Sequence, residues 1–372
     1  MPVLWLCGPP GVGKTTVGWE IYSQLIRSGM QTGYVDIDQL GICYPEPASD
    51  PGRHRMKARN LQAVITSFQT AGVGCVVVSG VVDAARGVPL HELPQAALTV
   101  CRLRADRKEL RQRFVGRQAQ VEQVREVLRE AEELDSSTVA EFCVDTSGLS
   151  VADVSRQVLA GTDGWPVVTG PSRPAAAAAS RSTAGVTDGP ILWLCGATGV
   201  GKSTVGFTVY QKATRAGQMM AYIDLVQINF HGPAPGDHRA RACRLAAIWR
   251  IYRTAGALGL VMVGPVDDEA TVTLYADALS EATITLCRLH AGRDQLTKRI
   301  MQRGQGGSWS QPGDPLKDQS PTHLLRVADQ AVLEADALER AAIGMRIDTN
   351  TRTAEQSADV VLAQSAWPRR TD

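Results

Sequence analysis

The sequence predicts an α/β fold built from two similar domains, each a parallel β-sheet between two layers of helices (α/β/α). Short apolar runs without polar alternation, such as VLWLC from Val3 and CVVVSG from Cys75, are typical of strands buried on both faces. Segments with helical apolar spacing lie between these runs, and such an alternation places the strands parallel in one sheet. The same order of segments occurs in both halves of the chain.

The elements of the first half follow from these patterns. The predicted strands cover residues 3–7, 32–37, 75–80, 97–103 and 141–146. The helices between them include TTVGWEIYSQLIRSG (15–29) and HRMKARNLQAVITSFQTAG (54–72), and each ends in a glycine at the usual C-cap position. Ligands of such sheets bind at the carboxyl ends of the strands, so we expect the functional residues there.

The second half of the chain repeats the first. LWLCGPPGVGKTTVG from Leu4 recurs as LWLCGATGVGKSTVG from Leu192, and other matching segments follow in the same order. The largest insertion in the second copy, GQGGSWSQPGDPLKDQSP (304–321), indicates an enlarged loop. We expect domain 1 to cover residues 1–160 and domain 2 residues 191–372. A flexible linker rich in Pro, Ala and Gly would join them over residues 161–190.

The composition is that of an ordinary soluble protein. The 372 residues carry a formal net charge of +1, so no basic field points to nucleic acid. No apolar run approaches the roughly 20 residues that span a bilayer, and no signal peptide precedes the first strand. The eight cysteines show no metal-binding spacing and are expected to be buried, reduced thiols. These features predict a cytoplasmic protein without a membrane or nucleic-acid partner, and they leave a homo-oligomer open.

Two segments fit the phosphate-loop (P-loop) pattern G-x-x-x-x-G-K-[ST], each between a strand and a helix: GPPGVGKT (8–15) and GATGVGKS (196–203). Their glycines let successive backbone N–H groups face one anion, and the helix N-terminus adds its positive end. The lysine reaches the β- and γ-phosphates, and the hydroxyl of Thr15 or Ser203 binds Mg²⁺. The fold class is therefore two tandem P-loop domains that bind ATP and Mg²⁺. The candidate ATP-binding residues are Gly8, Gly11, Val12, Gly13, Lys14, Thr15 and Thr16 in the first copy, and Gly196, Gly199, Val200, Gly201, Lys202, Ser203 and Thr204 in the second.

Two other classes of P-loop protein fit the sequence less well. DQLG from Asp38 resembles the GTPase pattern D-x-x-G, but no guanine-reading N-K-x-D segment occurs in the chain, which favours ATP over GTP. A motor or AAA+ ATPase needs an acidic pair at the end of its Walker B strand. The corresponding runs here end in VVVSG and LVMVG, without an acid.

Three further motifs of the first copy accompany the P-loop: DID (36–38), the arginine segment after CRLRAD, and DTSG (145–148). Together the four motifs resemble the small P-loop kinases close to adenylylsulfate, gluconate and shikimate kinases, and their relatives labelled AAA-type ATPases. The resemblance implies that Asp36 and Asp38 lie beside Mg²⁺ and the acceptor hydroxyl. It also implies that Arg113 and Arg117 belong to a lid over the phosphates, and that the DTSG loop packs on adenine.

The chemistry of these residue types agrees with such roles, but each has a plainer alternative. Phosphoryl transfer depends on positioning and charge neutralisation, which Lys14, Mg²⁺ and mobile arginines can supply. Asp38 can take a proton from an acceptor hydroxyl or hold Mg²⁺ through water, or it can be a helix N-cap. Arg113 and Arg117 share one helix face and can equally form a solvated basic surface.

A third cluster, RHRMKAR (53–59), follows the DID strand and has a counterpart, DHRARACR, in the second copy. Arg55 and Arg59 share one helix face and can grip an anionic acceptor such as a sulfate, phosphate or carboxylate. The alternative is surface charge on an amphipathic helix. His54 recurs in the second copy, but a lone histidine is usually structural.

The two copies differ at one proposed catalytic position, because Val226 stands in the second copy where Asp38 stands in the first. Valine can neither accept a proton nor coordinate Mg²⁺. We therefore expect a kinase (a transferase) whose first domain moves the γ-phosphoryl group of Mg-ATP to a hydroxyl group of a small metabolite, either anionic or neutral. The second domain would be structural or regulatory. The alternative is a regulatory or assembly protein that binds ATP with little or no turnover.

Overall fold

The computed structural model describes residues 1–115, 121–166, 188–232, 237–306 and 314–368. Within them the chain forms two compact units. Unit 1 contains Met1–Gly41, Ala48–Ala184 and Asn229–Asp237, and unit 2 contains Ile42–Pro47, Gly185–Ile228 and His238–Asp372. No helix of the described residues is long and apolar enough to cross a membrane.

Unit 1 has a six-stranded sheet in the order β6-β5-β1-β4-β2-β9. Five strands are parallel, and β9 pairs antiparallel with β2 at the edge. The strands are β1 (Pro2–Cys7), β2 (Thr32–Asp36), β4 (Cys75–Ser79), β5 (Ala97–Arg104), β6 (Phe142–Asp145) and β9 (His231–Gly232). The helices are α1 (Lys14–Arg27), α2 (His54–Thr70), α3 (Arg107–Val115), α4 (Val121–Asp135) and α5 (Val151–Ala160).

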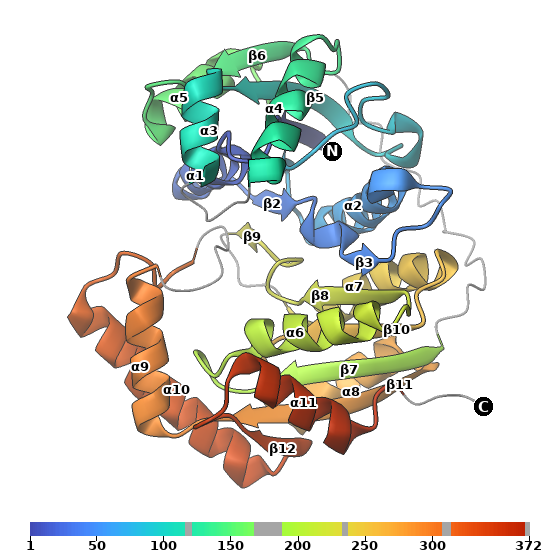
Figure 1. Cartoon of the computed structure of the whole chain (residues 1–372), viewed down its shortest axis with the longest axis vertical. Coiled ribbons are helices and arrows are strands. Elements are labelled where there is room, and N and C mark those ends of the chain that lie inside the picture. The colour runs from blue at the N-terminus through green and yellow to red at the C-terminus, as the bar shows by residue number, and fades with distance from the viewer. Residues whose placement is uncertain (116–120, 167–187, 233–236, 307–313, 369–372) are drawn as a thin grey trace. The chain divides into compact units, whose positions relative to one another are not determined.

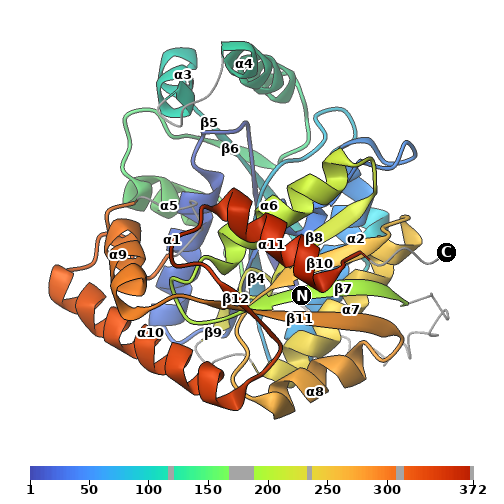
Figure 2. The same cartoon turned by 60° about the horizontal axis from the view of Figure 1, so that its bottom comes forward.

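Unit 2 has the same strand arrangement, in the order β12-β11-β7-β10-β8-β3, with β3 antiparallel to β8 at the edge. Figure 2 shows helices on both faces of this sheet, with α11 on one face and α8 on the other. The strands are β3 (Cys43–Tyr44), β7 (Gly189–Cys195), β8 (Met220–Asp224), β10 (Gly259–Val263), β11 (Ala282–His290) and β12 (Met345–Asp348). The helices are α6 (Lys202–Arg215), α7 (His238–Thr254), α8 (Glu269–Ala278), α9 (Arg293–Gly304), α10 (Pro321–Ala341) and α11 (Ala354–Ser365).

The central strands have the character that the sequence predicted. In β1 every side chain from Val3 to Cys7 is buried, and all of β4 is buried as well. β1 lies between β4 and β5, with Leu4 opposite Val77 on one side and Thr99 on the other. A strand covered on both faces and both edges must be apolar throughout, which explains the lack of alternation. The prediction of parallel sheets flanked by helices is confirmed.

Two short strands were not predicted from the sequence. β9 of unit 1 comes from the second half of the chain, and β3 of unit 2 comes from the first half (Figure 1). Two-residue strands carry too little apolar pattern to be recognised in a sequence. The expected domain boundaries at 1–160, 161–190 and 191–372 stay a prediction, because residues 167–187 of the expected linker lie outside the described residues.

Candidate nucleotide and acceptor sites

In unit 1 the P-loop curls tightly between the end of β1 and the start of α1. Gly8, Gly11 and Gly13 have φ angles of 142°, 87° and 104°, a region that favours glycine. A Cβ atom on Gly8 would also lie 2.4 Å from the Leu103 carbonyl oxygen on β5. Gly13 is the N-cap of α1 and supplies no side-chain cap. The first N–H groups of this helix are therefore without a side-chain cap and can receive an anion.

The corresponding loop of unit 2 has the same backbone. Gly196, Gly199 and Gly201 have φ angles of 140°, 78° and 103°, and a Cβ on Gly196 would lie 2.5 Å from the Leu289 carbonyl oxygen. Gly201 is the N-cap of α6, again without a side-chain cap. The two loops thus share their glycine φ angles and a helix start without a side-chain cap.

Both P-loop lysines lie under their own loop. Lys14 Nζ donates to the carbonyl oxygens of Gly8 (2.7 Å) and Pro9 (3.0 Å), and Lys202 Nζ donates to those of Gly196 (2.8 Å) and Ala197 (3.0 Å). Burial lowers the pKa of both ammonium groups. A desolvated cation held by neutral carbonyls gains strongly from an added anion, so this position suits a phosphate.

A hydroxyl–carboxylate pair follows each lysine. The Thr15 hydroxyl lies 3.4 Å from Asp36 Oδ2, and the Ser203 hydroxyl donates to Asp224 Oδ2 at 2.8 Å. Oxygen atoms of this kind are the ligands that Mg²⁺ prefers, and Mg²⁺ usually completes its shell with phosphate and water oxygens. The described residues contain no group of three or more His, Cys, Asp or Glu that could hold a metal alone. A Mg²⁺ ion at either pair would need phosphate or water oxygens to complete its ligand set.

Asp36 is protonated more easily than an ordinary carboxyl group. Burial raises its pKa to about 7, and the neighbouring Asp38 charge adds to this effect. The backbone N–H of Asp38 donates to Asp36 Oδ1 at 3.0 Å and opposes the rise. A bound cation would favour the charged form.

We expect Asp36→Asn to stabilise the metal-free protein above pH 7 and to have little effect near pH 4. The folded-state pKa lies above the ordinary value of 3.8, so the charged carboxylate destabilises the fold increasingly as pH rises from about 4 to about 7. Three pKa units correspond to a gain of up to about 4 kcal/mol. Urea unfolding at pH 4 and pH 8 measures the difference. The exposed Asp277→Asn is the control, and equal pH dependence in both variants would contradict the prediction.

Asp38 is paired with a lysine that the sequence analysis did not single out. Lys57 Nζ lies 2.8 Å from Asp38 Oδ1, and the Lys57 side chain is 7% exposed, whereas that of Asp38 is 45% exposed. Gly41 makes room for this lysine, because a Cβ there would lie 2.5 Å from Lys57 Cε. The signal in the sequence was the position of Lys57, three residues before the buried Asn60 and four before the buried Leu61 on one face of α2.

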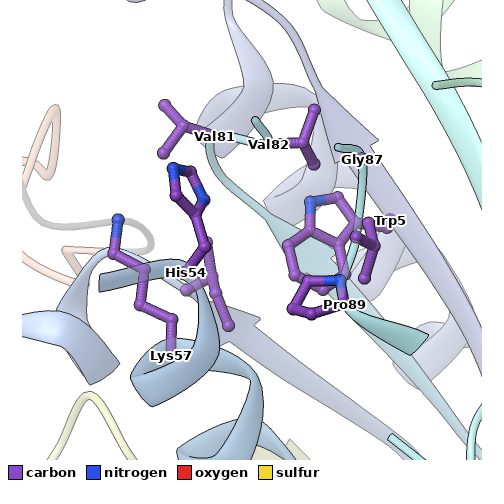
Figure 3. Close-up of a pocket in the computed structure, with 9 residues that line it drawn as sticks. Trp5, His54, Lys57, Val81, Val82, Gly87 and Pro89 are labelled. Atoms are coloured by element: carbon purple, nitrogen blue, oxygen red, sulfur yellow. The ribbon is translucent and has the colours of Figure 1, made fainter. Parts of the chain in front are cut away.

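A small, open pocket lies next to this ion pair. Its wall includes Trp5 from β1, His54 and Lys57 from α2, and the segment after β4 with Val81 and Val82 (Figure 3). Burial and the Lys57 charge lower the pKa of His54, which favours its neutral form. The pocket therefore combines an aromatic wall with one neutral imidazole and the lysine that pairs with Asp38.

The first part of the chain has a recognisable relative. Residues 4–135 match the AAA domain family model. The matched AAA-domain region contains the P-loop, Asp36, Asp38 and the pocket, and it ends at the last residue of α4. This match confirms the expected resemblance to AAA-type P-loop relatives for the first half of the chain.

Solved structures with kinase names are also similar to this chain. A gluconokinase from Sinorhizobium meliloti 1021 is 17% identical over 48% of this chain and 91% of its own, with a TM-score of 0.32. A shikimate kinase from Acinetobacter baumannii is 21% identical over 43% of this chain and 91% of its own, with a TM-score of 0.29. A putative kinase from Chloroflexus aurantiacus is 17% identical over 48% of this chain and 98% of its own, with a TM-score of 0.30. No curated protein matches the chain.

Within the AAA-domain region, Arg55 and Arg59 share a carboxylate. Arg55 Nε lies 3.4 Å from Glu92 Oε1 and Arg59 Nε 2.9 Å from Glu92 Oε2. The hydrogen bond from Arg59 holds the pKa of Glu92 below its usual range. Neither arginine is among the residues that line the pocket next to Lys57. Their role in acceptor binding stays a prediction.

The arginine expected in the lid connects the P-loop to the loop after β6. Arg113 donates to the Val12 carbonyl oxygen at 3.3 Å and to the Thr146 hydroxyl and carbonyl oxygens at 2.8 and 2.9 Å. In unit 2, Arg299 connects Val200 to Thr349 in the same way. Arg113 or Arg299 would have to give up some of these hydrogen bonds to contact a phosphate. Arg117 lies outside the described residues, and the catalytic roles of both Arg113 and Arg117 stay predictions.

The P-loop of unit 2 carries an additional carboxylate contact. The backbone N–H of Thr198 donates to Glu334 Oε2 of α10 at 2.9 Å. Thr198 belongs to the loop whose N–H groups would face the phosphates, so Glu334 occupies one donor with a negative charge. Sequence reasoning missed this residue, because α10 lies far from the P-loop along the chain.

We expect Glu334→Ala to strengthen ATP binding in unit 2 by about tenfold, because a nucleotide would no longer compete with a charged acceptor for this donor. The reference protein and the Glu334→Ala variant would both also carry Lys14→Ala in the first P-loop, so that titration with ATP isolates the second site. The matched control is Asp336→Ala, which removes an exposed carboxylate two residues away on the same helix. Unchanged or weaker binding in Glu334→Ala would show that this carboxylate does not compete with phosphate.

Proposed function

We propose that the protein is an ATP-dependent phosphotransferase that phosphorylates a hydroxyl group of a small molecule in unit 1. The observation that carries the proposal is the ion pair between Asp38 and the buried Lys57. Lys57 lines the pocket, and Asp38 lies two residues after Asp36 of the Thr15–Asp36 pair. One carboxylate oxygen of Asp38 is held by the lysine, and the side chain remains 45% exposed. Such a carboxylate can receive a proton from a bound hydroxyl.

The residues of unit 1 would divide the reaction among them. Lys14 and the N–H groups at the start of α1 neutralise charge on the β- and γ-phosphates. Thr15 and Asp36 supply oxygen ligands, and Mg²⁺ bound there would offset charge on the phosphate oxygens. The acceptor oxygen forms a bond to the γ-phosphorus while the bond to the β–γ bridging oxygen breaks. The hydroxyl proton passes to Asp38, and ADP leaves.

The pocket bears on the class of acceptor. Lys57 offers a positive charge at the pocket wall, and this charge suits an acceptor with a carboxylate or a phosphate as well as a hydroxyl. An acceptor that carries a negative charge as well as a hydroxyl group would therefore suit this site.

Unit 2 would bind nucleotide without completing this chemistry. Val226 occupies the position of Asp38, and its backbone N–H donates to Asp224 Oδ1 at 3.0 Å, as the Asp38 N–H does to Asp36. The fold of the segment is kept while the carboxylate is lost. The Glu334 contact favours the second candidate function, an ATP-binding regulatory protein with slow turnover, for this unit.

Incubation with γ-labelled ATP, Mg²⁺ and a metabolite extract would test the proposal. We expect label in a small, anionic organic product, with GTP a poorer donor than ATP. Lys14→Ala is the control for contaminating kinases. ATP binding by calorimetry without any labelled organic product would instead support the regulatory function.

A further inference from the structure

Each unit is completed by a short segment from the opposite half of the chain. We call Ile42–Pro47 arm 1 and Asn229–Asp237 arm 2; of arm 2 the structure describes residues 229–232 and 237. Arm 1 leaves the first half just after Asp38 and belongs to unit 2. Arm 2 leaves the second half just after Ile228 and belongs to unit 1.

Arm 2 supplies the edge strand of the sheet in unit 1. Gly232 and His231 pair with Thr32 and Gly33 of β2, and the Tyr34 N–H donates to the Phe230 carbonyl oxygen at 2.8 Å. The Phe230 ring packs edge-on against Trp19, with ring centroids 4.9 Å apart, and lies 6.1 Å from the Tyr34 ring. This arm therefore contributes backbone pairing and an aromatic side chain to the core of unit 1.

Arm 1 does the same for unit 2. Cys43 and Tyr44 pair with Ala221 and Met220 of β8, and the Tyr222 N–H donates to the Ile42 carbonyl oxygen at 2.9 Å. Cys43 is fully buried, and Ile42 packs against the core of the unit. Tyr34 and Tyr222 occupy matching positions in GYVDID and AYIDLV. The exchange is therefore reciprocal, and the matching backbone N–H is the donor in both units.

We propose that the two halves of this chain are obligate partners, and that each half completes its sheet only with the arm of the other. Without its arm, β2 or β8 would be an open edge strand with unpaired N–H and C=O groups, which proteins usually avoid. The exchange places apolar side chains as well as hydrogen bonds at these edges, so its loss also exposes core surface. This assignment gives the second half a necessary role even if it performs no chemistry, and it does not depend on the proposed function.

Cleavage of the folded full-length protein tests this proposal. A specific protease site inserted within residues 167–187 would separate the two halves covalently without altering either arm. We expect the cut halves to remain a one-to-one complex in size-exclusion chromatography with light scattering at micromolar concentration. The readout requires no nucleotide and no acceptor.

Arm variants make the test specific. Phe230→Ala and Ile42→Ala should each weaken association of the cut halves by roughly tenfold or more, since each removes an apolar group packed against a core. The uncut variants should stay folded in thermal melts, because a linker holds the arms at an effective concentration in the millimolar range. Leu333→Ala, at a side chain that is 61% exposed on α10, is the control and should leave association unchanged.

Two results would overturn the proposal. One is separation of the cut wild-type halves into two fragments that each still unfold cooperatively. The other is association that persists with the same dissociation constant in both arm variants, since the arms would then not be what joins the halves.

Discussion

Replacement of Lys14 by alanine is expected to lower kcat for phosphoryl transfer by about 10²–10³-fold, because the transferred phosphoryl group loses a positioned positive charge. Lys14 is buried and held by the Gly8 and Pro9 carbonyl oxygens, so its ammonium group is already in place before the nucleotide binds. Steady-state kinetics with one identified acceptor, together with thermal melts to confirm folding, would measure this effect.

The matched control lies in the same molecule. Lys202 has the same contacts in unit 2, at 2.8 and 3.0 Å, but unit 2 has Val226 where unit 1 has Asp38. Lys202→Ala should therefore change nucleotide binding or stability while leaving kcat within about threefold. If Lys202→Ala abolished transfer and Lys14→Ala did not, the working site would lie in unit 2.

Asp38→Asn is expected to reduce kcat by about 10²–10⁴-fold while ATP binding changes little, since loss of a positioned general base has effects of this size. Asparagine keeps the shape of the side chain and can still contact Lys57, so the pocket should keep its form. Calorimetric titration of ATP and single-turnover kinetics would separate binding from transfer. Asp153→Asn, at a surface carboxylate of the same unit, is the control.

A normal rate in Asp38→Asn would assign Asp38 a structural role as the partner of Lys57. Loss of ATP binding in the same variant would mean that the carboxylate acts mainly through the metal site. Only a low rate with intact ATP binding agrees with proton transfer to this residue.

The sequence alone predicted the class of fold and the two glycine-rich loops that end in a lysine. Gly8, Lys14 and Thr15 lie close together in the sequence. Their geometry therefore follows from a few consecutive φ angles and from the helix that begins there. The buried strands could also be predicted from the sequence, because an unbroken apolar run such as β1 is stable only when both of its faces are buried.

The tertiary structure decided which polar side chains meet. Lys57 reaches Asp38 because α2 returns over the end of β2, and Arg55 and Arg59 turn instead to Glu92. In the sequence all three cationic residues belong to one basic run, and residue type alone does not show which of them pairs with Asp38. Their direction depends on which face of α2 is buried, and packing sets that face.

Contacts between distant segments were beyond any local pattern. Glu334 accepts a hydrogen bond from the Thr198 N–H. Phe230 and Ile42 each belong to the unit that is formed mainly by the other half of the chain. A strand of two residues has no periodicity, and its pairing is fixed only by the open edge that it covers. The sequence by itself thus determined the two glycine-rich loops and the strands that carry them. The pairing of Asp38 with Lys57 and the exchange of the arms arise instead from long-range packing, which local residue order does not encode.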